Sequence, residues 1–289
     1  MAYKVMIINT SRVLEVSSSI RSIKNIIAEL RKKDPQYLAV KNLVDSLGMN
    51  KASLLTIINS LISYQLSIPG EVYWERFSRY FSKPGASLNT SDLRKFLLET
   101  GCSRLLDQKM RRVDKILTSN IAEKLLINGL FYCDNVEALI KELSSTLNAS
   151  KDSKTVVFAA KMYSYICDIA GKKTNLENIA IPVDYRNSLL ALTSCIIVDC
   201  RGHSLRDCAR KFSSSMYSKY VRDAWMNVCK LSGIPCLELD VFTWIFAGVA
   251  VKADFNVLET TKIFKEKYGV DLDLNVARIL LECVENYVR

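Results

Sequence analysis

Residues 153–163 read Ser153-Lys154-Thr155-Val156-Val157-Phe158-Ala159-Ala160-Lys161-Met162-Tyr163. The apolar residues of this stretch fit the period of an α-helix, and two lysines interrupt them. Lys154, Phe158 and Lys161 are spaced i, i+4 and i+7, so a helix places all three side chains on one face. The stretch therefore predicts a helix with one face that carries both aromatic and cationic groups.

The segment before this helix, residues 148–153, is short and polar. Asp152 and Ser153 are both suitable N-caps, which places Lys154 in the first helical turn. The N-terminus of a helix carries partial positive charge and free N–H groups, and this field, together with burial, favours a neutral amine over an ammonium. Two interpretations of Lys154 follow: a nucleophilic lysine, or a solvated lysine at a loop-to-helix junction.

The composition is that of a globular, soluble protein, with 289 residues of which 49% are apolar and 24% charged. This length can bury a core in one large domain or in two modest ones. Forty Lys and Arg against thirty Asp and Glu give a net charge of +10. Such a charge suits a polyanionic partner such as nucleic acid, although many basic proteins bind none.

Nine cysteines are present, and no secretory signal precedes them. The opening residues 5–8 are too short for a signal core or a membrane span, so we expect reduced thiols and a cytoplasmic protein without a membrane segment. The cysteines form no CxxC pair, and His203 is the only histidine. The sequence therefore predicts no metal site, neither zinc nor iron–sulfur, and no cofactor.

Only five prolines and ten glycines occur, and the long segments show a 3.6-residue period, which predicts an almost all-α protein. The expected helices cover residues 20–32, 51–66, 71–81, 90–99, 104–115, 121–128, 136–147, 187–198, 239–248 and 274–288, besides the helix that begins at Lys154. We expect the helix over residues 20–32 to end at residues 33–35, which include Pro35. Residues 104–115 carry five basic side chains and form either a phosphate-facing helix or a solvated face. The aromatics of residues 71–81 are expected in the core.

Polar residues next to apolar runs mark further candidate positions. Gln65 follows Leu61 at helical spacing and is either a surface residue at a helix end or a residue that recognises a ligand. Asp184 lies just ahead of a helix, where a carboxylate can cap free N–H groups and still take part in catalysis. Asp240 and Trp244 are an i, i+4 pair in an apolar run. Asp240 either caps that helix or faces a polar ligand, because an isolated buried carboxylate is costly.

Several of these segments together resemble one protein family, the archaeal 8-oxoguanine DNA glycosylases known as AGOG, of the helix-hairpin-helix glycosylase superfamily. The segments that carry the resemblance are residues 63–67, 70–74, 154–162, 181–186 and 240–244. The resemblance covers roughly residues 50–289 in the family's order. Two departures stand out: residues 147–152 replace the glycine-rich hairpin of the wider superfamily, and its frequent four-cysteine cluster is missing.

The resemblance implies an all-α fold of two helical subdomains with the active-site cleft between them. On this basis we expect a helical extension over residues 1–50, a discontinuous subdomain of residues 51–97 and 199–289, and a central subdomain of residues 98–198 that carries the hairpin and the catalytic lysine.

The resemblance also implies the roles of individual residues. Lys154 matches the Schiff-base lysine and Asp184 the catalytic aspartate. The positions that match residues lining the pocket for the extruded base are Gln65, Phe158, Lys161, Pro182, Asp240 and Trp244.

The activity implied is that of a bifunctional N-glycosylase and AP lyase that flips out 8-oxoguanine, excises it through a lysine Schiff base and cleaves the strand by β-elimination. The expected partner is double- or single-stranded DNA, and the expected protein is a cytoplasmic, nucleoid-associated monomer. Two alternatives stay open: a glycosylase for another damaged purine, and a non-catalytic helical DNA-binding protein in which Lys154 only contacts phosphate.

Overall fold

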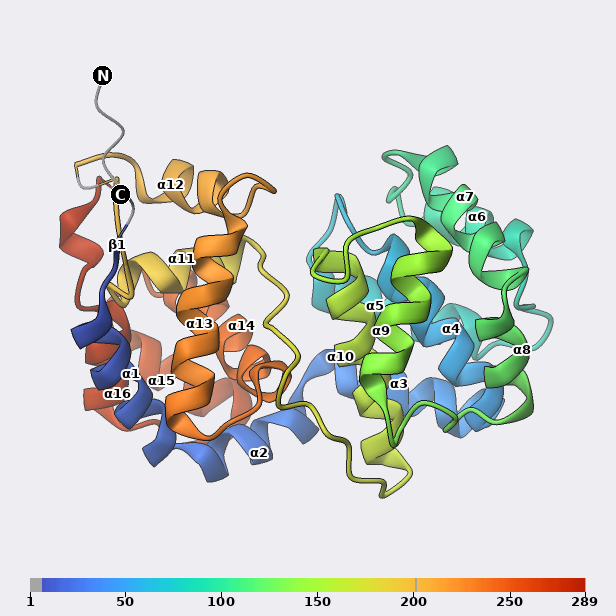
Figure 1. Cartoon of the computed structure of the whole chain (residues 1–289), viewed down its shortest axis with the longest axis horizontal. Coiled ribbons are helices and arrows are strands. Elements are labelled where there is room, and N and C mark those ends of the chain that lie inside the picture. The colour runs from blue at the N-terminus through green and yellow to red at the C-terminus, as the bar shows by residue number, and fades with distance from the viewer. Residues whose placement is uncertain (1–6, 201, 289) are drawn as a thin grey trace. The chain divides into compact units, whose positions relative to one another are not determined.

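The computed structural model of the chain describes residues 7–200 and 202–288 (Figure 1). The expectations for residues 5 and 6 therefore lie outside the described residues. The fold is all-α, as predicted, apart from one two-stranded sheet. The chain divides into two compact units. We name Asp34–Leu176 the central unit, and the described residues up to Lys33 together with those from Glu177 onward the terminal unit.

The central unit consists of eight helices around an aromatic core. They are α3 (Pro35–Leu47), α4 (Met49–Ile62), α5 (Gly70–Phe81), α6 (Thr90–Glu99), α7 (Leu106–Leu117), α8 (Asn120–Ile127), α9 (Val136–Leu147) and α10 (Lys154–Ile169). Helix α10 packs against α3, α4 and α9. Tyr73, Trp74, Phe77 and Phe81 of α5 are buried, and the rings of Phe77 and Phe96 meet edge to face at 5.2 Å. The predicted core role is confirmed for these four aromatics, whereas Tyr80 of the same helix is only half-buried.

The terminal unit combines both ends of the described chain. Its elements are β1 (Ile7–Ile8), α1 (Thr10–Ser22), α2 (Lys24–Lys33), α11 (Tyr185–Thr193), β2 (Ile197–Val198), α12 (Leu205–Phe212), α13 (Ser218–Ser232), α14 (Cys236–Lys252), α15 (Val257–Tyr268), α16 (Leu274–Leu281) and the 3-10 turn η1 (Val284–Asn286). Strands β1 and β2 pair antiparallel. Helix α14 is buried along most of its length and packs against α2, α11 and α15. Among the described residues no single helix is long and apolar enough to cross a membrane; α13 and α14 pass that test only as a pair bent by 112°.

The boundary between the units differs from the predicted domain boundaries. Residues 33–35 were expected to stop a helix, but Asp34 also starts the next one: its side chain accepts a hydrogen bond from Gln36 N at 2.8 Å, and Pro35 occupies the first turn of α3. The chain thus passes from α2 of the terminal unit into α3 of the central unit, and residues 1–50 do not form a separate extension. The predicted boundary at residue 97 falls inside α6, which packs on α5 through its aromatics.

The second crossing between the units lies at residues 176 and 177, ahead of the predicted boundary at residue 198. The reason is that α11, which precedes residue 198, packs against α12, α13 and α14 of the terminal unit. Several helix ends also differ from the predicted ones, since α4 ends at Ile62, α11 at Thr193 and α16 at Leu281.

Six of the nine cysteines form disulfides, so the expectation of reduced thiols is wrong for these six. The pairs are Cys133–Cys167 in the central unit, and Cys195–Cys283 and Cys229–Cys236 in the terminal unit. Their Cα atoms lie between 5.4 and 5.7 Å apart, within the range that a disulfide needs. The sequence separations of 34, 88 and 7 residues show why spacing alone did not reveal them.

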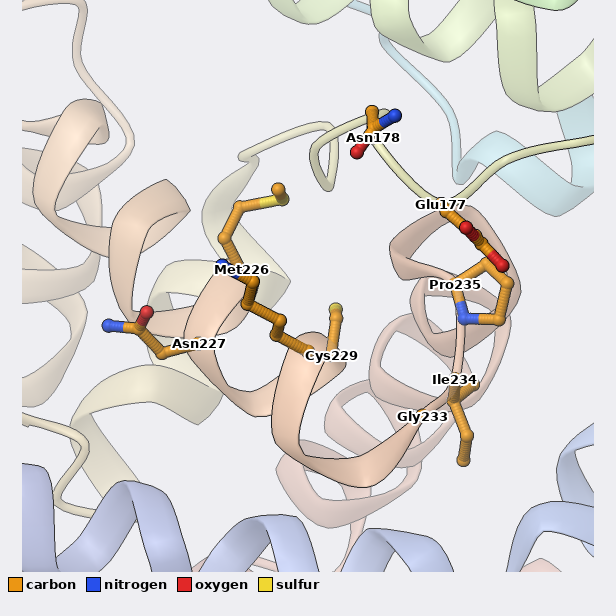
Figure 2. Close-up of a pocket in the computed structure, with 9 residues that line it drawn as sticks. Glu177, Asn178, Met226, Asn227, Cys229, Gly233, Ile234 and Pro235 are labelled. Carbon is orange, nitrogen blue, oxygen red and sulfur yellow. The ribbon is translucent and has the colours of Figure 1, made fainter.

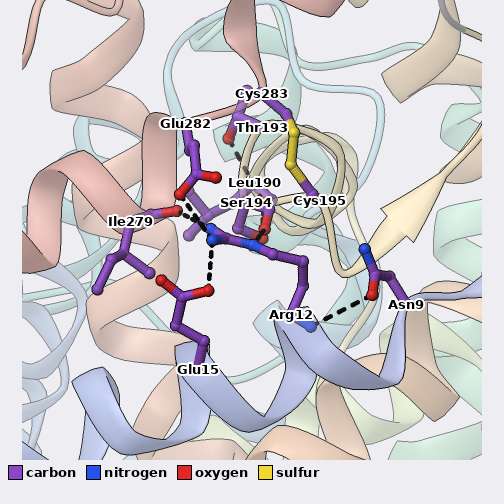
Figure 3. The surroundings of a disulfide bond; sticks show 10 residues. All are labelled: Asn9, Arg12, Glu15, Leu190, Thr193, Ser194, Cys195, Ile279, Glu282 and Cys283. Carbon is purple, nitrogen blue, oxygen red and sulfur yellow. Dashed lines mark hydrogen bonds and ion pairs between the residues drawn. A yellow bond between two sulfur atoms is a disulfide. The ribbon is translucent and has the colours of Figure 1, made fainter.

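The disulfide Cys195–Cys283 lies beside a buried arginine that connects α1 to the end of the chain (Figure 3). Arg12 donates through Nε to the carbonyl oxygen of Ser194 at 3.1 Å and through Nη2 to that of Ile279 at 2.7 Å. Its guanidinium also pairs with Glu282 at 2.6 Å. Charge-assisted hydrogen bonds of this kind are stronger than neutral ones, so Arg12 and the disulfide together fasten α1, α11 and α16 to one another.

Candidate active site

Lys154 is the first residue of α10, as predicted. Ser153 occupies the N-cap position, but its side chain makes no capping hydrogen bond; its carbonyl oxygen accepts from the N–H groups of Val156 and Val157. The Lys154 side chain is exposed. Within residues 7–200 and 202–288 its amine takes part in no hydrogen bond or ion pair. The helix-terminal position is thus confirmed, whereas the expected burial of this side chain is not found.

One helical turn further along α10, Phe158 presents an aromatic ring. The ring is half-buried and meets the indole of Trp74 edge to face, with centroids 6.2 Å apart. Trp74 is itself buried and contacts Phe77. An edge-to-face contact fixes the orientation of a ring. The ammonium of Lys161 lies 6.0 Å from the centroid of the Phe158 ring. Trp74 was expected only as a core residue, and the structure shows that it also positions Phe158.

Lys161 is buried and paired. Its side chain is 1% exposed, and its ammonium lies 3.9 Å from Oδ2 of Asp34, which is fully buried, and 3.5 Å from Oε1 of Gln36. Asp34 also accepts a 2.5 Å hydrogen bond from the hydroxyl of Tyr165. The additional hydrogen bonds hold this buried ion pair in one geometry. Removal of either partner would leave an uncompensated buried charge, which is costly. Nothing in the sequence pointed to this pairing, since residues 33–35 were interpreted as a helix stop.

Gln65 lies away from the ridge on which it was predicted. Helix α4 ends at Ile62, and Gln65 is exposed in the following loop with φ of 48°, in the left-handed region. The expected helical alignment of Leu61 with Gln65 is therefore wrong. A left-handed residue after a helix end reverses the direction of the chain, and the i, i+4 relation no longer holds.

The neighbouring Tyr64 carries the contacts of this loop. Arg112 and Lys109 of α7 lie over its ring, at 5.0 and 5.2 Å from the centroid. Arg112 also donates to Thr155 Oγ1 at 3.2 Å, next to Lys154. Lys109 is buried, which lowers its pKa, and it donates to the carbonyl oxygen of Cys102 at 2.8 Å. The basic helix α7 therefore is not a uniformly solvated face, and two of its cations point inward.

In the terminal unit, Asp184 caps α11. Its Oδ1 accepts a hydrogen bond from the backbone N–H of Asn187 at 2.9 Å, and the side chain is half-buried. The predicted capping role is confirmed. The same asparagine donates from Nδ2 to the carbonyl oxygen of Pro182 at 3.1 Å, so the segment ahead of α11 is held to its first turn.

The side chain of Asn187 also reaches Asp240. Its Nδ2 donates to Oδ1 of Asp240 at 2.6 Å, and its Oδ1 accepts from the hydroxyl of Thr243 at 2.7 Å. Asp240 is 2% exposed and lies inside α14, whose N-cap position is Pro235. The interpretation of Asp240 as a cap is therefore wrong, and the expected requirement for a polar partner is met by Asn187. The sequence did not single out Asn187.

Trp244, one turn after Asp240, has one ring face covered. The guanidinium carbon of Arg186 lies 4.0 Å from its ring centroid, and Nη1 of the same arginine donates to the carbonyl oxygen of Trp244 at 3.4 Å. Gly248 leaves room for this contact, because an added Cβ there would lie 3.1 Å from the guanidinium. The structure thus brings Pro182, Asp184, Asp240 and Trp244 together in the terminal unit through Asn187 and Arg186.

A cavity of about 490 Å³ in the terminal unit lies apart from these predicted residues (Figure 2). It opens between the connection of α13 to α14 and the segment at Glu177 and Asn178. Its other lining residues are Met226, Asn227, Cys229, Lys230, Gly233, Ile234 and Pro235. None of the eight predicted site residues lines it. In the part of the chain that the structure describes, no three His, Cys, Asp or Glu side chains are grouped so as to hold a metal ion.

Comparisons with known proteins relate the whole chain to one family. The profile of the family described as "AGOG: N-glycosylase/DNA lyase" matches residues 17–278. A curated N-glycosylase/DNA lyase of Methanococcus maripaludis is 33% identical over 223 residues, which are 75% of this chain and 79% of that protein. The N-glycosylase/DNA lyase of Pyrobaculum aerophilum is also 33% identical, over 78% of this chain and 81% of its own length.

Among solved structures, the chain is similar to Pa-AGOG, an 8-oxoguanine DNA glycosylase from Pyrobaculum aerophilum crystallised with 8-oxoguanosine. The TM-score is 0.67 at 27% identity, with 89% of this chain and 96% of that chain covered. Fold and sequence thus define a helical DNA glycosylase. The chain belongs to the AGOG family of N-glycosylase/DNA lyases. The family match begins at residue 17, so the expectation that the first fifty residues lie beyond the resemblance is wrong.

Proposed function

We propose that this protein is a bifunctional N-glycosylase and AP lyase that excises 8-oxoguanine from DNA through a Schiff base on Lys154 and then cleaves the strand by β-elimination. The observation that carries the proposal is the exposed, unpaired amine of Lys154 at the N-terminus of α10, in a chain of the AGOG family. The similarity to Pa-AGOG, which was crystallised with 8-oxoguanosine, supports 8-oxoguanine as the base. The net charge of +10 suits a DNA substrate.

The target nucleotide first leaves the base stack, at a cost of about a few kcal/mol. The amine of Lys154 attacks C1′ as the bond from C1′ to the base breaks, and the base departs with the electron pair and takes up a proton. Opening of the sugar ring gives the Schiff base. Loss of a proton from C2′ then expels the 3′ phosphate, which is the lyase step. Asp184 stabilises the positive charge that develops on the sugar and assists proton movement to and from the lysine.

The geometry around Asp184 supports this role. The hydrogen bond from the Asn187 N–H to Oδ1 orients the carboxylate, and it is the only hydrogen bond of the Asp184 side chain in the described part of the chain. The second oxygen is therefore accessible for a proton or for a developing cation. Because the donor is the backbone N–H of Asn187, substitution of the Asn187 side chain leaves this hydrogen bond to Asp184 in place.

Binding of the base is assigned to the remaining predicted residues. Because Arg186 covers one face of Trp244, the opposite face is the one that stacks on an extruded base. Phe158 offers a second ring, fixed by Trp74. Asp240, oriented by Asn187, is a candidate acceptor for the N7–H that 8-oxoguanine has and guanine lacks. Lys161 acts as an oriented donor, and Pro182 and the exposed Gln65 complete the proposed set.

The proposed substrate is double- or single-stranded DNA that contains 8-oxoguanine, and the proposed protein is a monomer in the cytoplasm, associated with the nucleoid. The chemistry runs on a lysine amine and a carboxylate. It needs neither a metal ion nor a redox cofactor.

A panel of duplexes, each with a single lesion, tests the substrate. The panel contains 8-oxoguanine, an alkylated purine, uracil and an abasic site, and borohydride is added to trap the Schiff base. We expect trapping and strand cleavage on 8-oxoguanine. Faster excision of an alkylated purine than of 8-oxoguanine would show that the lesion is assigned wrongly.

The same assay tests the nucleophile. Lys154→Gln is expected to abolish base release and trapping while DNA binding survives. The matched control is Lys151→Gln, an exposed lysine three residues earlier, which should keep trapping. Undiminished base release by Lys154→Gln would refute the assignment of the nucleophile.

A further inference from the structure

Two free cysteines of the terminal unit lie together outside the proposed active site. Cys200 follows β2 and is half-buried, and Cys208 is a buried residue of α12. The Cys208 thiol lies 3.9 Å from the carbonyl oxygen of Cys200. Lys211 completes the cluster, with its ammonium 3.8 Å from Sγ of Cys200 and 3.2 Å from Oδ2 of Asp199.

The two thiols differ in their surroundings. Burial and the neighbouring thiol of Cys200 raise the pKa of Cys208, which keeps Cys208 protonated. Cys200 is the more accessible of the two, and the Lys211 ammonium stabilises the negative charge that its sulfur carries when it attacks an oxidant. The third free cysteine, Cys102, is fully buried in the central unit and provides an internal comparison.

We propose that Cys200 and Cys208 form a redox-active dithiol that a peroxide oxidises to a fourth disulfide. Cys200 attacks one peroxide oxygen: an S–O bond forms, the O–O bond breaks, and the leaving oxygen departs as water. The sulfur of Cys208 then attacks the sulfenic acid of Cys200, so that the S–S bond forms and the S–O bond breaks with release of a second water. The two thiols are oxidised, and one peroxide is reduced to two waters.

The position of the cluster gives the oxidation a structural consequence. The backbone between Cys200 and Cys208 holds the end of the chain: Gly202 N–H donates to the carbonyl oxygen of Asn286 at 2.8 Å, and Leu205 N–H to that of Val288 at 2.9 Å. A disulfide restricts the chain that it closes. Oxidation should therefore slow the opening of the segment around Val288, independently of the proposed glycosylase reaction.

The test treats the full-length protein, with its three disulfides intact, with hydrogen peroxide, blocks remaining thiols with an alkylating reagent, and maps tryptic peptides without reduction. Trypsin cleaves after Arg201 and Arg206, so Cys200 and Cys208 fall on different peptides. We expect these peptides to become linked, with the loss of two hydrogen atoms in mass, while Cys102 remains alkylated. Hydrogen exchange at Leu205 should slow in the oxidised protein.

Variants assign the two roles. Cys208→Ser should leave a sulfenic acid on Cys200 that dimedone captures, and Cys200→Ser should leave Cys208 as a thiol. Lys211→Met removes the ammonium that lies 3.8 Å from Sγ of Cys200 and should slow oxidation about threefold or more, whereas Lys211→Arg, which keeps the positive charge, should not. Thermal unfolding of each variant before peroxide treatment, with the three disulfides intact, confirms its fold.

Three outcomes would overturn the proposal. The first is the absence of linked peptides after peroxide treatment of the folded protein. The second is oxidation of Cys208 in Cys200→Ser at the wild-type rate. The third is oxidation of Cys102 as fast as that of Cys200. A defect in base excision has no bearing on any of these measurements, so this proposal and the proposed function are tested separately.

Discussion

Replacement of Asn187 by alanine is expected to uncouple Asp240 from α11 and to leave the bond to Asp184 intact. The side chain of Asn187 donates to Asp240 at 2.6 Å and to the Pro182 carbonyl at 3.1 Å, and it accepts from Thr243 at 2.7 Å. All three bonds vanish in Asn187→Ala. The bond to Asp184 comes from the backbone N–H and remains.

The magnitude follows from the three lost bonds. A hydrogen bond to a buried charged group contributes about 1.5–3 kcal/mol and a neutral one about 1 kcal/mol, so the loss is about 4 kcal/mol. Alanine has a higher helix propensity than asparagine, which returns about 0.5 kcal/mol. The net decrease in the free energy of unfolding is therefore about 3–4 kcal/mol.

Urea denaturation followed by circular dichroism measures this decrease. Thr243→Val is the matched control, because it removes only one of the three bonds and should cost about 1–2 kcal/mol. Single-turnover excision of 8-oxoguanine should fall at least tenfold in Asn187→Ala, because Asp240 loses its orienting donor. If Asn187→Ala is no less stable than Thr243→Val, or excises the base at the wild-type rate, the assigned coupling of Asn187 to Asp240 is wrong.

Three further predictions concern other parts of the molecule. Gly248→Ala places a methyl group 3.1 Å from the Arg186 guanidinium and should displace it from the indole, lowering kcat/KM for 8-oxoguanine excision about threefold or more with little change in Tm. Asp34→Asn should lower the free energy of unfolding, measured by urea denaturation, by about 3–5 kcal/mol, because it leaves the Lys161 charge buried without this counterion. The double variant with Lys161→Met should recover part of that loss. Additive effects of the two substitutions would contradict the pairing. Glu142 of α9 accepts hydrogen bonds from Lys124 and from the hydroxyl of Tyr132. Burial alone would raise the pKa of Glu142, but these hydrogen bonds outweigh burial, so the pKa is lowered from 4.5. Its stabilising contribution is present above pH 4.5 and lost as the pH falls below that value, and Glu142→Gln should flatten this acid dependence in thermal unfolding.

The sequence determined the helical fold because helix formation depends on neighbours three or four residues apart. The predicted ranges 90–99 and 136–147 coincide with α6 and α9, and the predicted start at Lys154 coincides with that of α10. Helix caps act over the same short range. The capping role of Asp184, which accepts a hydrogen bond from the Asn187 N–H, was therefore also predictable from the sequence. The family resemblance, carried by short motifs, led to the correct family.

Only the tertiary structure decided what these residues contact. Asn187 and Asp240 are 53 residues apart, and Lys161 and Gln36 are 125 apart. Such contacts depend on how several helices pack, and no local period encodes that packing. The same reason explains the disulfides, the boundary between the units at Asp34, and the loop that carries Gln65 off its predicted ridge. The sequence thus determined which side chains lie at the helix ends and faces, and packing alone determined which of them are paired, buried or left exposed as Lys154 is.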